Sequence, residues 1–98
     1  MYIDNQLLHN EICRSIEQDK FTDTANDMFT RLAVLIMRKI HYPDAFRKCA
    51  IGYAIAESER MLKHYKVDNT ILPNYAFNFS SEVIKRSIAN FYRKLNKK

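Results

Sequence analysis

Aromatic and basic side chains are concentrated in the last quarter of the chain. Phe77 and Phe79 stand among small polar residues, and basic residues then recur at helical spacing. These basic residues are Lys85, Arg86, Arg93, Lys94, Lys97 and Lys98, with Glu82 as the only acid in the same stretch. Aromatic rings stack on unpaired bases, and cations close to a strand neutralise its phosphates. The segment therefore predicts contact with single-stranded nucleic acid.

The two phenylalanines also fit a purely structural role. An aromatic side chain at the start of a helix often packs into the core as a hydrophobic staple. Phe77 and Phe79 are expected in or next to a loop that precedes the last helix, where both roles are open to them. At least one of the two rings must be exposed if the segment stacks on bases.

Metal and catalytic sites have little support in the sequence. His9 and Cys13 are four residues apart, a spacing that can chelate a metal, but no second pair of ligands accompanies them. Glu57 and Glu59 are two residues apart and so lie on different faces of a helix. With Gly52 as the only glycine, a glycine-rich phosphate loop cannot form. We therefore expect no enzyme activity, no metal and no cofactor.

The composition describes one small folded domain over residues 1–98. Hydrophobic residues make up 47% and charged residues 28%, a balance typical of a globule rather than a disordered chain. No apolar stretch reaches the length of about 18 residues that a membrane span needs, and the first five residues do not resemble a signal peptide. Cys13 and Cys49 are isolated, which is typical of reduced, buried cysteines in a cytoplasmic protein.

The net charge of +5 is unevenly distributed. Residues 1–30 hold more acids than bases, whereas residues 31–98 hold more bases than acids. Charge of this kind can simply solvate helix surfaces, but the asymmetry also fits a protein that touches nucleic acid with one end only.

Hydrophobic spacing predicts two helices in the first half of the chain. The first is expected over residues 5–18, where an apolar residue recurs at every fourth position. The second begins near residues 22–24, where Thr24 and Asp27 resemble a capping box. It ends before Pro43, because the residue preceding a proline is disfavoured in a helix.

Two further helices are expected in the second half. Asp44 is placed to cap a third helix over residues 45–65, and small residues in it permit close approach of another backbone. These small residues are Ala50, Gly52, Ala54 and Ala56. An irregular stretch over residues 67–78 leads to a fourth helix capped by Ser80 or Ser81. Its inward face is expected to carry Val83, Ile84, Ser87, Ile88, Phe91 and Leu95. The fold class is therefore all-α, a single compact bundle of about four helices.

A family resemblance connects these segments. The run Ala76–Ile88 resembles the promoter-melting segment of sigma factors, most closely that of the small late sigma factors of tailed phages. Leu62–Asp68 is similar to the end of the family's clamp-binding helix, and Asn26–Ile40 to the first helix of the same core region. The order of elements matches from about Asp23 to Lys98, and residues 1–22 precede this core as an acidic helix.

The resemblance implies a helical bundle, sigma region 2-like, whose middle helix docks on the beta-prime clamp coiled coil of core RNA polymerase. Its last helix and the preceding loop would capture flipped bases of melted promoter DNA. It implies base contacts by Phe77, Asn78, Phe79 and Ser81, and phosphate contacts by Lys85, Arg86, Asn90, Arg93 and Lys94. The implied polymerase-binding residues are Arg47, Lys48, Glu57 and Arg60.

Departures from the family's pattern keep other functions open. Primary sigma factors carry a tryptophan pair at positions matching Glu82 and Val83, and this chain has no tryptophan. The run Cys49–Ala54 replaces an acidic docking motif that contains glutamine. Because the sequence ends at Lys98, no helix-turn-helix domain is expected, and a separate coactivator polypeptide could supply the missing contacts. The alternatives are a sigma-mimicking inhibitor or accessory modulator of RNA polymerase, a generic helical nucleic-acid-binding module, and a scaffold protein.

Overall fold

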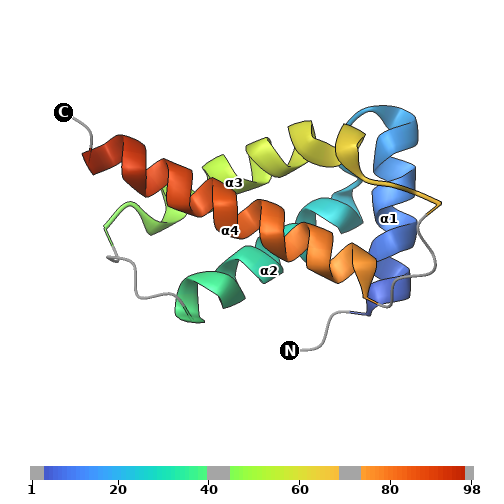
Figure 1. Ribbon diagram of the computed structural model, residues 1–98, viewed down its shortest axis with the longest axis horizontal. Coiled ribbons are helices and arrows are strands. Elements are labelled where there is room, and N and C mark those ends of the chain that lie inside the picture. The colour runs from blue at the N-terminus through green and yellow to red at the C-terminus, as the bar shows by residue number, and fades with distance from the viewer. Residues whose placement is uncertain (1–3, 40–44, 69–73, 97–98) are drawn as a thin grey trace.

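The computed structural model describes residues 4–39, 45–68 and 74–96. They form α1 (Asn5–Gln18), α2 (Asp23–Lys39), α3 (Arg47–Met61), the short 3₁₀ helix η1 (Leu62–His64) and α4 (Tyr75–Asn96). These ranges contain no strand, and none of their helices is long and apolar enough to cross a membrane. In Figure 1, α4 crosses in front of α2 and α3, and α1 closes one end of the bundle. The prediction of a single compact all-α bundle is confirmed.

The helix α1 has its predicted bounds because local residues determine both of its ends. The Asp4 carboxylate accepts hydrogen bonds from the backbone N–H groups of Gln6 (2.8 Å) and Leu7 (3.1 Å), as an N-cap residue does. At the other end Asp19 adopts a φ of 61°, and its N–H donates to the Ile16 carbonyl at 3.2 Å. A left-handed residue at this position ends a helix and satisfies one of its free carbonyl groups.

The helix α2 has a different cap from the predicted one. The Thr22 hydroxyl accepts a hydrogen bond from the Ala25 N–H at 3.0 Å, so Thr22 is the N-cap residue. Thr22 also donates its hydroxyl hydrogen to the buried Glu11 carboxylate at 2.8 Å, a contact with α1 that holds it in place. Thr24 and Asp27 lie inside the helix. The predicted capping box is therefore wrong, because a tertiary contact decides which threonine caps.

The helix α3 packs through small side chains. Ala50, Ala54 and Ser58 recur at intervals of four and are fully buried. Their size lets the α3 backbone lie close to its neighbours, and α3 and α4 make the most extensive helix contact in the fold. The predicted close approach is confirmed at Ala50 and Ala54, whereas Gly52 and Ala56 lie on the exposed face.

The start of α3 differs from the prediction. The helix begins at Arg47, after Phe46, which adopts a φ of 67° and makes no side-chain cap. Cys49 is exposed rather than buried, because α3 turns its alanine face and not Cys49 toward the bundle. Asp44, the predicted cap, and Pro43, the predicted end of the second helix, lie outside the described residues.

The helix α4 begins at Tyr75, five residues before the earlier of its two predicted caps. The N–H of Phe77, in the first turn, donates to the Asn5 Oδ1 of α1 at 2.9 Å. The predicted caps, Ser80 and Ser81, are buried inside the helix. The prediction is wrong because the capping side chain comes from another helix, where no local pattern reveals it.

The inward face of α4 matches the prediction except near its end. Val83, Ile84, Ser87 and Ile88 are buried, and Phe91 is half-buried. Leu95 is 36% exposed, so its predicted core position is wrong. Tyr92 is buried instead, and its hydroxyl donates to the Ala45 carbonyl at 3.5 Å. The last turn of α4 therefore extends beyond the core, and Leu95 is not covered by it.

Candidate nucleic-acid interface

The residues predicted to contact bases lie on different flanks of α4. Phe77 and Ser81 are four residues apart and line a groove between α4 and α2. Asn78 and Phe79 line a cleft between α4 and the end of α3. Residues two apart on a helix point to different sides. The structure therefore places the two phenylalanines in separate surroundings.

The cleft between α4 and the end of α3 is open and has a volume of about 400 Å³. Its lining residues are Met61, His64, Tyr75, Asn78, Phe79, Glu82, Val83 and Arg86. Three of them offer complementary chemistry to one ligand: the Phe79 ring, the Asn78 amide and the Arg86 guanidinium. Glu82 also lines the cleft, so its charge is mixed.

Phe79 is held by an aromatic cluster. Its ring meets the Tyr65 ring edge to face, with 5.0 Å between centroids, and Tyr65 stacks on Tyr75, also at 5.0 Å. Phe79 is half-buried, since it packs against the core and also lines the cleft. The structural role and the stacking role proposed for an aromatic residue at this position are thus compatible.

Phe77 has an aliphatic setting. Its side chain is 38% exposed and borders a groove of about 220 Å³. The other lining residues are Leu32, Leu35, Ile36 and Lys39 from α2, and Ser81 and Lys85 from α4. Within the described residues, no other aromatic ring contacts Phe77. The groove and the cleft therefore offer different contacts to a ligand.

His9 and Cys13 connect α1 to the aromatic cluster. The His9 Nδ1 lies 2.6 Å from the Tyr65 hydroxyl, and the Cys13 Sγ lies 3.6 Å from the His9 Nε2. Burial, followed by the proximity of Cys13 and Tyr75, raises the pKa of Tyr65 to about 12, and burial and Glu17 raise the pKa of Cys13. The Cys13 thiol therefore keeps its proton at neutral pH, which does not favour a role as a nucleophile. In the described part of the chain, no three His, Cys, Asp or Glu side chains are grouped to hold a metal.

The residues predicted to contact phosphates do not form one row. Arg86, Asn90 and Lys94 follow each other at intervals of four on the α3 side of α4. Arg93 is exposed on the outer face, and Lys85 lies on the opposite flank, in the groove. A single strand that follows one flank therefore cannot use all five residues in the same way.

Lys94 is fixed by α3. Its Nζ donates to the Tyr53 hydroxyl at 3.0 Å and lies 5.2 Å from the centre of the same ring. The hydrogen bond to Tyr53 is the main cause that raises the pKa of Lys94. The ring of Tyr53 in turn packs against Phe91, with 5.6 Å between centroids. Lys94 thus keeps its charge at a defined position near the end of the basic row.

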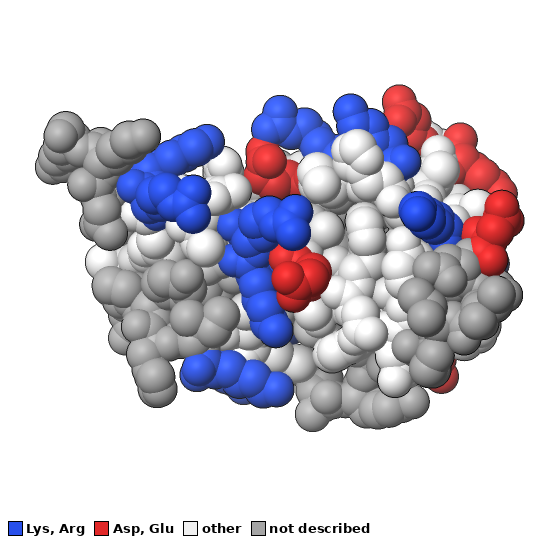
Figure 2. All heavy atoms as spheres, in the orientation of Figure 1, with Lys and Arg blue, Asp and Glu red and all other residues white. Residues whose placement is uncertain are grey.

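Basic and acidic side chains are unevenly distributed over the bundle. Figure 2 shows Lys and Arg spread over α3 and α4 with a few acids among them, while more of the visible Asp and Glu lie toward the end of the bundle that α1 closes. Several acids have structural partners: for example, the buried Glu11 lies 3.1 Å from Arg14, and Glu59 accepts a hydrogen bond from the Phe21 N–H at 2.7 Å. The charge asymmetry of the sequence therefore becomes an asymmetry of the surface.

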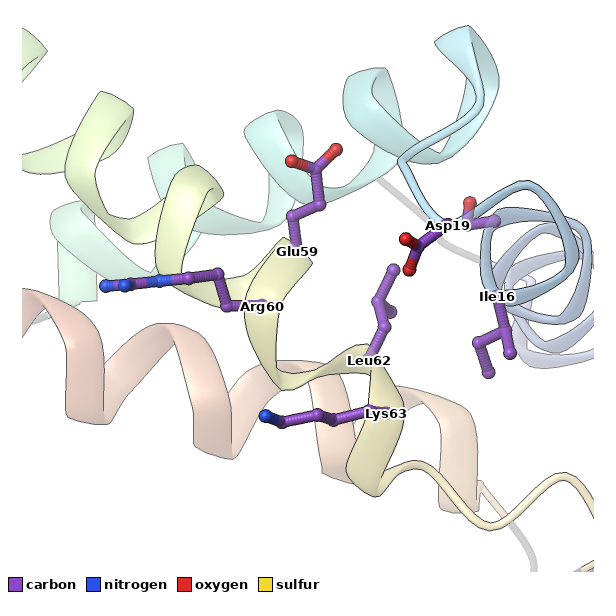
Figure 3. A pocket seen from close by; sticks show the side chains of 7 residues that line it. Ile16, Asp19, Glu59, Arg60, Leu62 and Lys63 are labelled. Carbon is purple, nitrogen blue, oxygen red and sulfur yellow. The ribbon is translucent and has the colours of Figure 1, made fainter.

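A third cavity, of about 240 Å³, lies between α1 and the end of α3. Figure 3 shows Ile16 and Asp19 on one side and Leu62 on the other, with Arg60 and Lys63 extending away from α1. The lining carries both charges, and none of the predicted DNA-binding residues belongs to it.

The residues predicted to bind polymerase border the outer face of α3. Lys48 and Arg60 are exposed, Glu57 forms an ion pair with Arg60, and Arg47 is half-buried. Between them lie three exposed small residues, Cys49, Gly52 and Ala56. A Cβ atom added at Gly52 would meet no atom within 4 Å. The resemblance places the run Cys49–Ala54 at the docking motif, and Gly52 and Ala56 were predicted to allow close approach of a backbone, but an exposed strip of Cys49, Gly52 and Ala56 was not predicted.

Comparisons with models of known protein families, with curated proteins and with solved structures find no match for this chain. Function is therefore inferred from the chemistry of three surfaces: the cleft beside Phe79, the groove beside Phe77 and the outer face of α3.

Proposed function

We propose that this chain is a transcription initiation factor of the sigma type, which binds core RNA polymerase and captures melted promoter DNA. The observation that carries the proposal is the cleft beside α4, where a ring, an amide and a guanidinium line one open space. The resemblance of Ala76–Ile88 to the promoter-melting segment of sigma factors points to the same surface.

Each of the three side chains has a defined task in base capture. The Phe79 ring stacks on an unpaired base, a contact worth about 1–3 kcal/mol per base. The Asn78 amide, which both donates and accepts hydrogen bonds, pairs with the edge of the base. Arg86 neutralises a neighbouring phosphate. Because unpaired bases cost least to hold, capture shifts the melting equilibrium of the promoter toward the open state.

The basic row on the same flank extends the contact along the strand. Arg86 and Lys94 are exposed and lie two turns apart, and each helical turn advances about 5.4 Å. Cations at this spacing can follow the backbone of one strand. Arg93 on the outer face adds to the positive potential that attracts DNA.

The outer face of α3 is the proposed polymerase contact. The small side chains of Cys49, Gly52 and Ala56 allow a partner helix to lie close, and Lys48 and Arg60 can pair with its acids. The resemblance to sigma factors identifies the partner as the coiled coil of the beta-prime clamp. No chemical step is assigned to the chain itself.

Retention of the chain on core RNA polymerase and its binding to fork-junction DNA test the proposal together. We expect retention on the polymerase, and stronger binding to a fork junction with an exposed single strand than to the matching duplex. Absence of both would contradict the proposal. Equal binding to all DNA forms, without retention on polymerase, would instead indicate a generic nucleic-acid-binding module.

Run-off transcription separates an initiation factor from an inhibitor. Added alone to core polymerase, an initiation factor produces specific starts, whereas a sigma-mimicking inhibitor binds the clamp and produces none. An Asn78→Ala variant serves as a control, because it should retain polymerase binding and lose starts. Asn78 is exposed on α4, away from the outer face of α3, so its loss should leave the polymerase contact intact.

A further inference from the structure

We propose that the groove between α2 and α4 binds an acidic amphipathic peptide segment of a separate polypeptide. Leu35 and Ile36 of α2 form one wall of the groove, and Phe77 of α4 forms the other. Its volume of about 220 Å³ is below the range of about 300–1,000 Å³ typical of small-molecule pockets. The groove therefore accepts an apolar anchor side chain of a longer ligand rather than a whole small molecule.

The charge around the groove specifies an acidic ligand. Lys39 stands on the α2 side and Lys85 on the α4 side, and none of the described residues that line the groove is a carboxylate. The cleft beside Phe79 includes Glu82, and the third cavity includes Asp19 and Glu59. In the described part of the chain, neither Lys39 nor Lys85 forms an ion pair. Two uncompensated cations beside an apolar surface are complementary to a peptide whose acids flank an apolar residue.

A nucleic-acid strand fits this groove less well than a peptide. Among the described residues that line the groove, Ser81 is the only uncharged polar side chain, and it is itself buried. The edges of a base carry several hydrogen-bond donors and acceptors, which these aliphatic walls would leave unpaired. An aliphatic or aromatic side chain of a peptide has no such groups to satisfy.

The groove shares no residue with the cleft or with the outer face of α3, so the inference can fail or hold apart from the proposed function, although it gives Phe77, Ser81 and Lys85 a different role from the DNA contacts that the resemblance implies. Its test uses the full chain and a fluorescein-labelled synthetic helical peptide with Leu at positions i, i+4 and i+7 and Glu between them. The matched probe has Gln in place of every Glu. By fluorescence anisotropy we expect the acidic peptide to bind about tenfold more tightly than the Gln peptide, with the difference shrinking at high salt.

Two variants locate the site. Lys39→Glu should weaken binding of the acidic peptide about tenfold, because it replaces an attraction with a repulsion. Arg38→Glu makes the same change of charge one residue earlier, at an exposed position outside the groove, and should have little effect. Leu35→Gln should weaken both peptides. Circular dichroism establishes that each variant is folded. If Leu35→Gln does not fold, the comparison of Lys39→Glu with Arg38→Glu still locates the binding site.

Several results would overturn the inference. Equal affinity for the two peptides, or equal effects of Lys39→Glu and Arg38→Glu, would show that the groove does not select acids. A nuclear magnetic resonance titration in which an oligo-dT strand, and not the peptide, shifts the methyl signals of Leu35 and Ile36 would assign the groove to nucleic acid. Sedimentation showing self-association that Lys39→Glu abolishes would assign it to a second copy of the chain.

Discussion

The two flanks of α4 have similar sequences and different chemistry. Each carries a phenylalanine near the start of the helix and a cation two turns later, Phe77 with Lys85 on one side and Phe79 with Arg86 on the other. Opposite Phe79, the end of α3 and the adjoining η1 present Met61 and His64, whereas α2 presents leucine and isoleucine opposite Phe77. The helix that faces each flank therefore decides what the flank can bind.

The largest expected difference between the flanks concerns stability. Phe79→Ala should lower the free energy of unfolding by about 2–3 kcal/mol, because the half-buried ring packs on Tyr65 and the core. Phe77→Ala should cost less than about 1 kcal/mol, because its ring is 38% exposed. Urea unfolding followed by circular dichroism measures both. Equal losses would show that the two rings are packed alike.

The next difference concerns single-stranded DNA. Arg86→Ala should weaken binding of an oligonucleotide severalfold and reduce the salt slope by about 0.7, the value for one phosphate contact on a single strand. Lys85→Ala, one residue earlier but on the other flank, should leave both quantities nearly unchanged. Anisotropy titrations at several salt concentrations measure the slopes. A larger effect at Lys85 would move the DNA contact to the groove.

A smaller effect on stability is expected in the first turn of α4, where both flanks begin. Asn5→Ala removes the acceptor for the Phe77 N–H and should lower the free energy of unfolding by about 1 kcal/mol. Amide exchange in the first turn of α4 should accelerate as well. Asn10→Ala is the matched control in the same helix, since Asn10 is exposed and its side chain accepts only from Gln6, at 3.1 Å. Indistinguishable results for the two variants would rule out a capping role for Asn5.

The smallest effect is expected between the flanks, at Ser80. Its buried Oγ has no hydrogen-bond partner among the described residues, so Ser80→Ala should leave the stability unchanged or raise it slightly. Ser15 is also buried, but its Oγ donates to the Glu11 carbonyl (2.8 Å) and accepts from the Thr22 N–H (3.1 Å). Ser15→Ala should therefore cost about 1–3 kcal/mol. Thermal unfolding compares the two, and a clear loss at Ser80 would reveal a partner such as a bound water.

The ends of a helix could be predicted where residues of the same helix determine them, and not where a side chain of another helix does. The bounds of α1 could be predicted because Asp4 and Asp19 act on their own helix. The start of α2 near residues 22–24 was predicted correctly, but its cap was not, because the contact with Glu11 holds Thr22 in place. The start of α4 was not predicted, because Asn5 of α1 supplies the acceptor for the Phe77 N–H. A side chain that reaches across the bundle leaves no signal in the neighbouring sequence.

The candidate site shows the same division. Phe77, Phe79, Lys85 and Arg86 could be selected from the sequence, since aromatic and basic residues are conspicuous there. Their distribution over two surfaces could not be predicted, because it depends on the helices that face α4: Phe77 and Lys85 line the groove beside α2, and Phe79 and Arg86 line the cleft beside α3. The small residues of α3 were recognised in the sequence, but their division between two faces was not, because small side chains permit close packing on either face and only the tertiary structure shows that Ala50 and Ala54 are buried while Cys49, Gly52 and Ala56 are exposed.

The sequence by itself determined that this chain forms an all-α bundle with a basic, aromatic last helix, because helical periodicity and charge are properties of consecutive residues. The tertiary structure decided that this helix has two unlike flanks. Residues two apart on a helix point in different directions, so Phe77 meets the aliphatic side of α2 and Phe79 meets the tyrosine cluster beside α3. The chemistry of each flank comes from side chains that lie close in space and far apart in sequence.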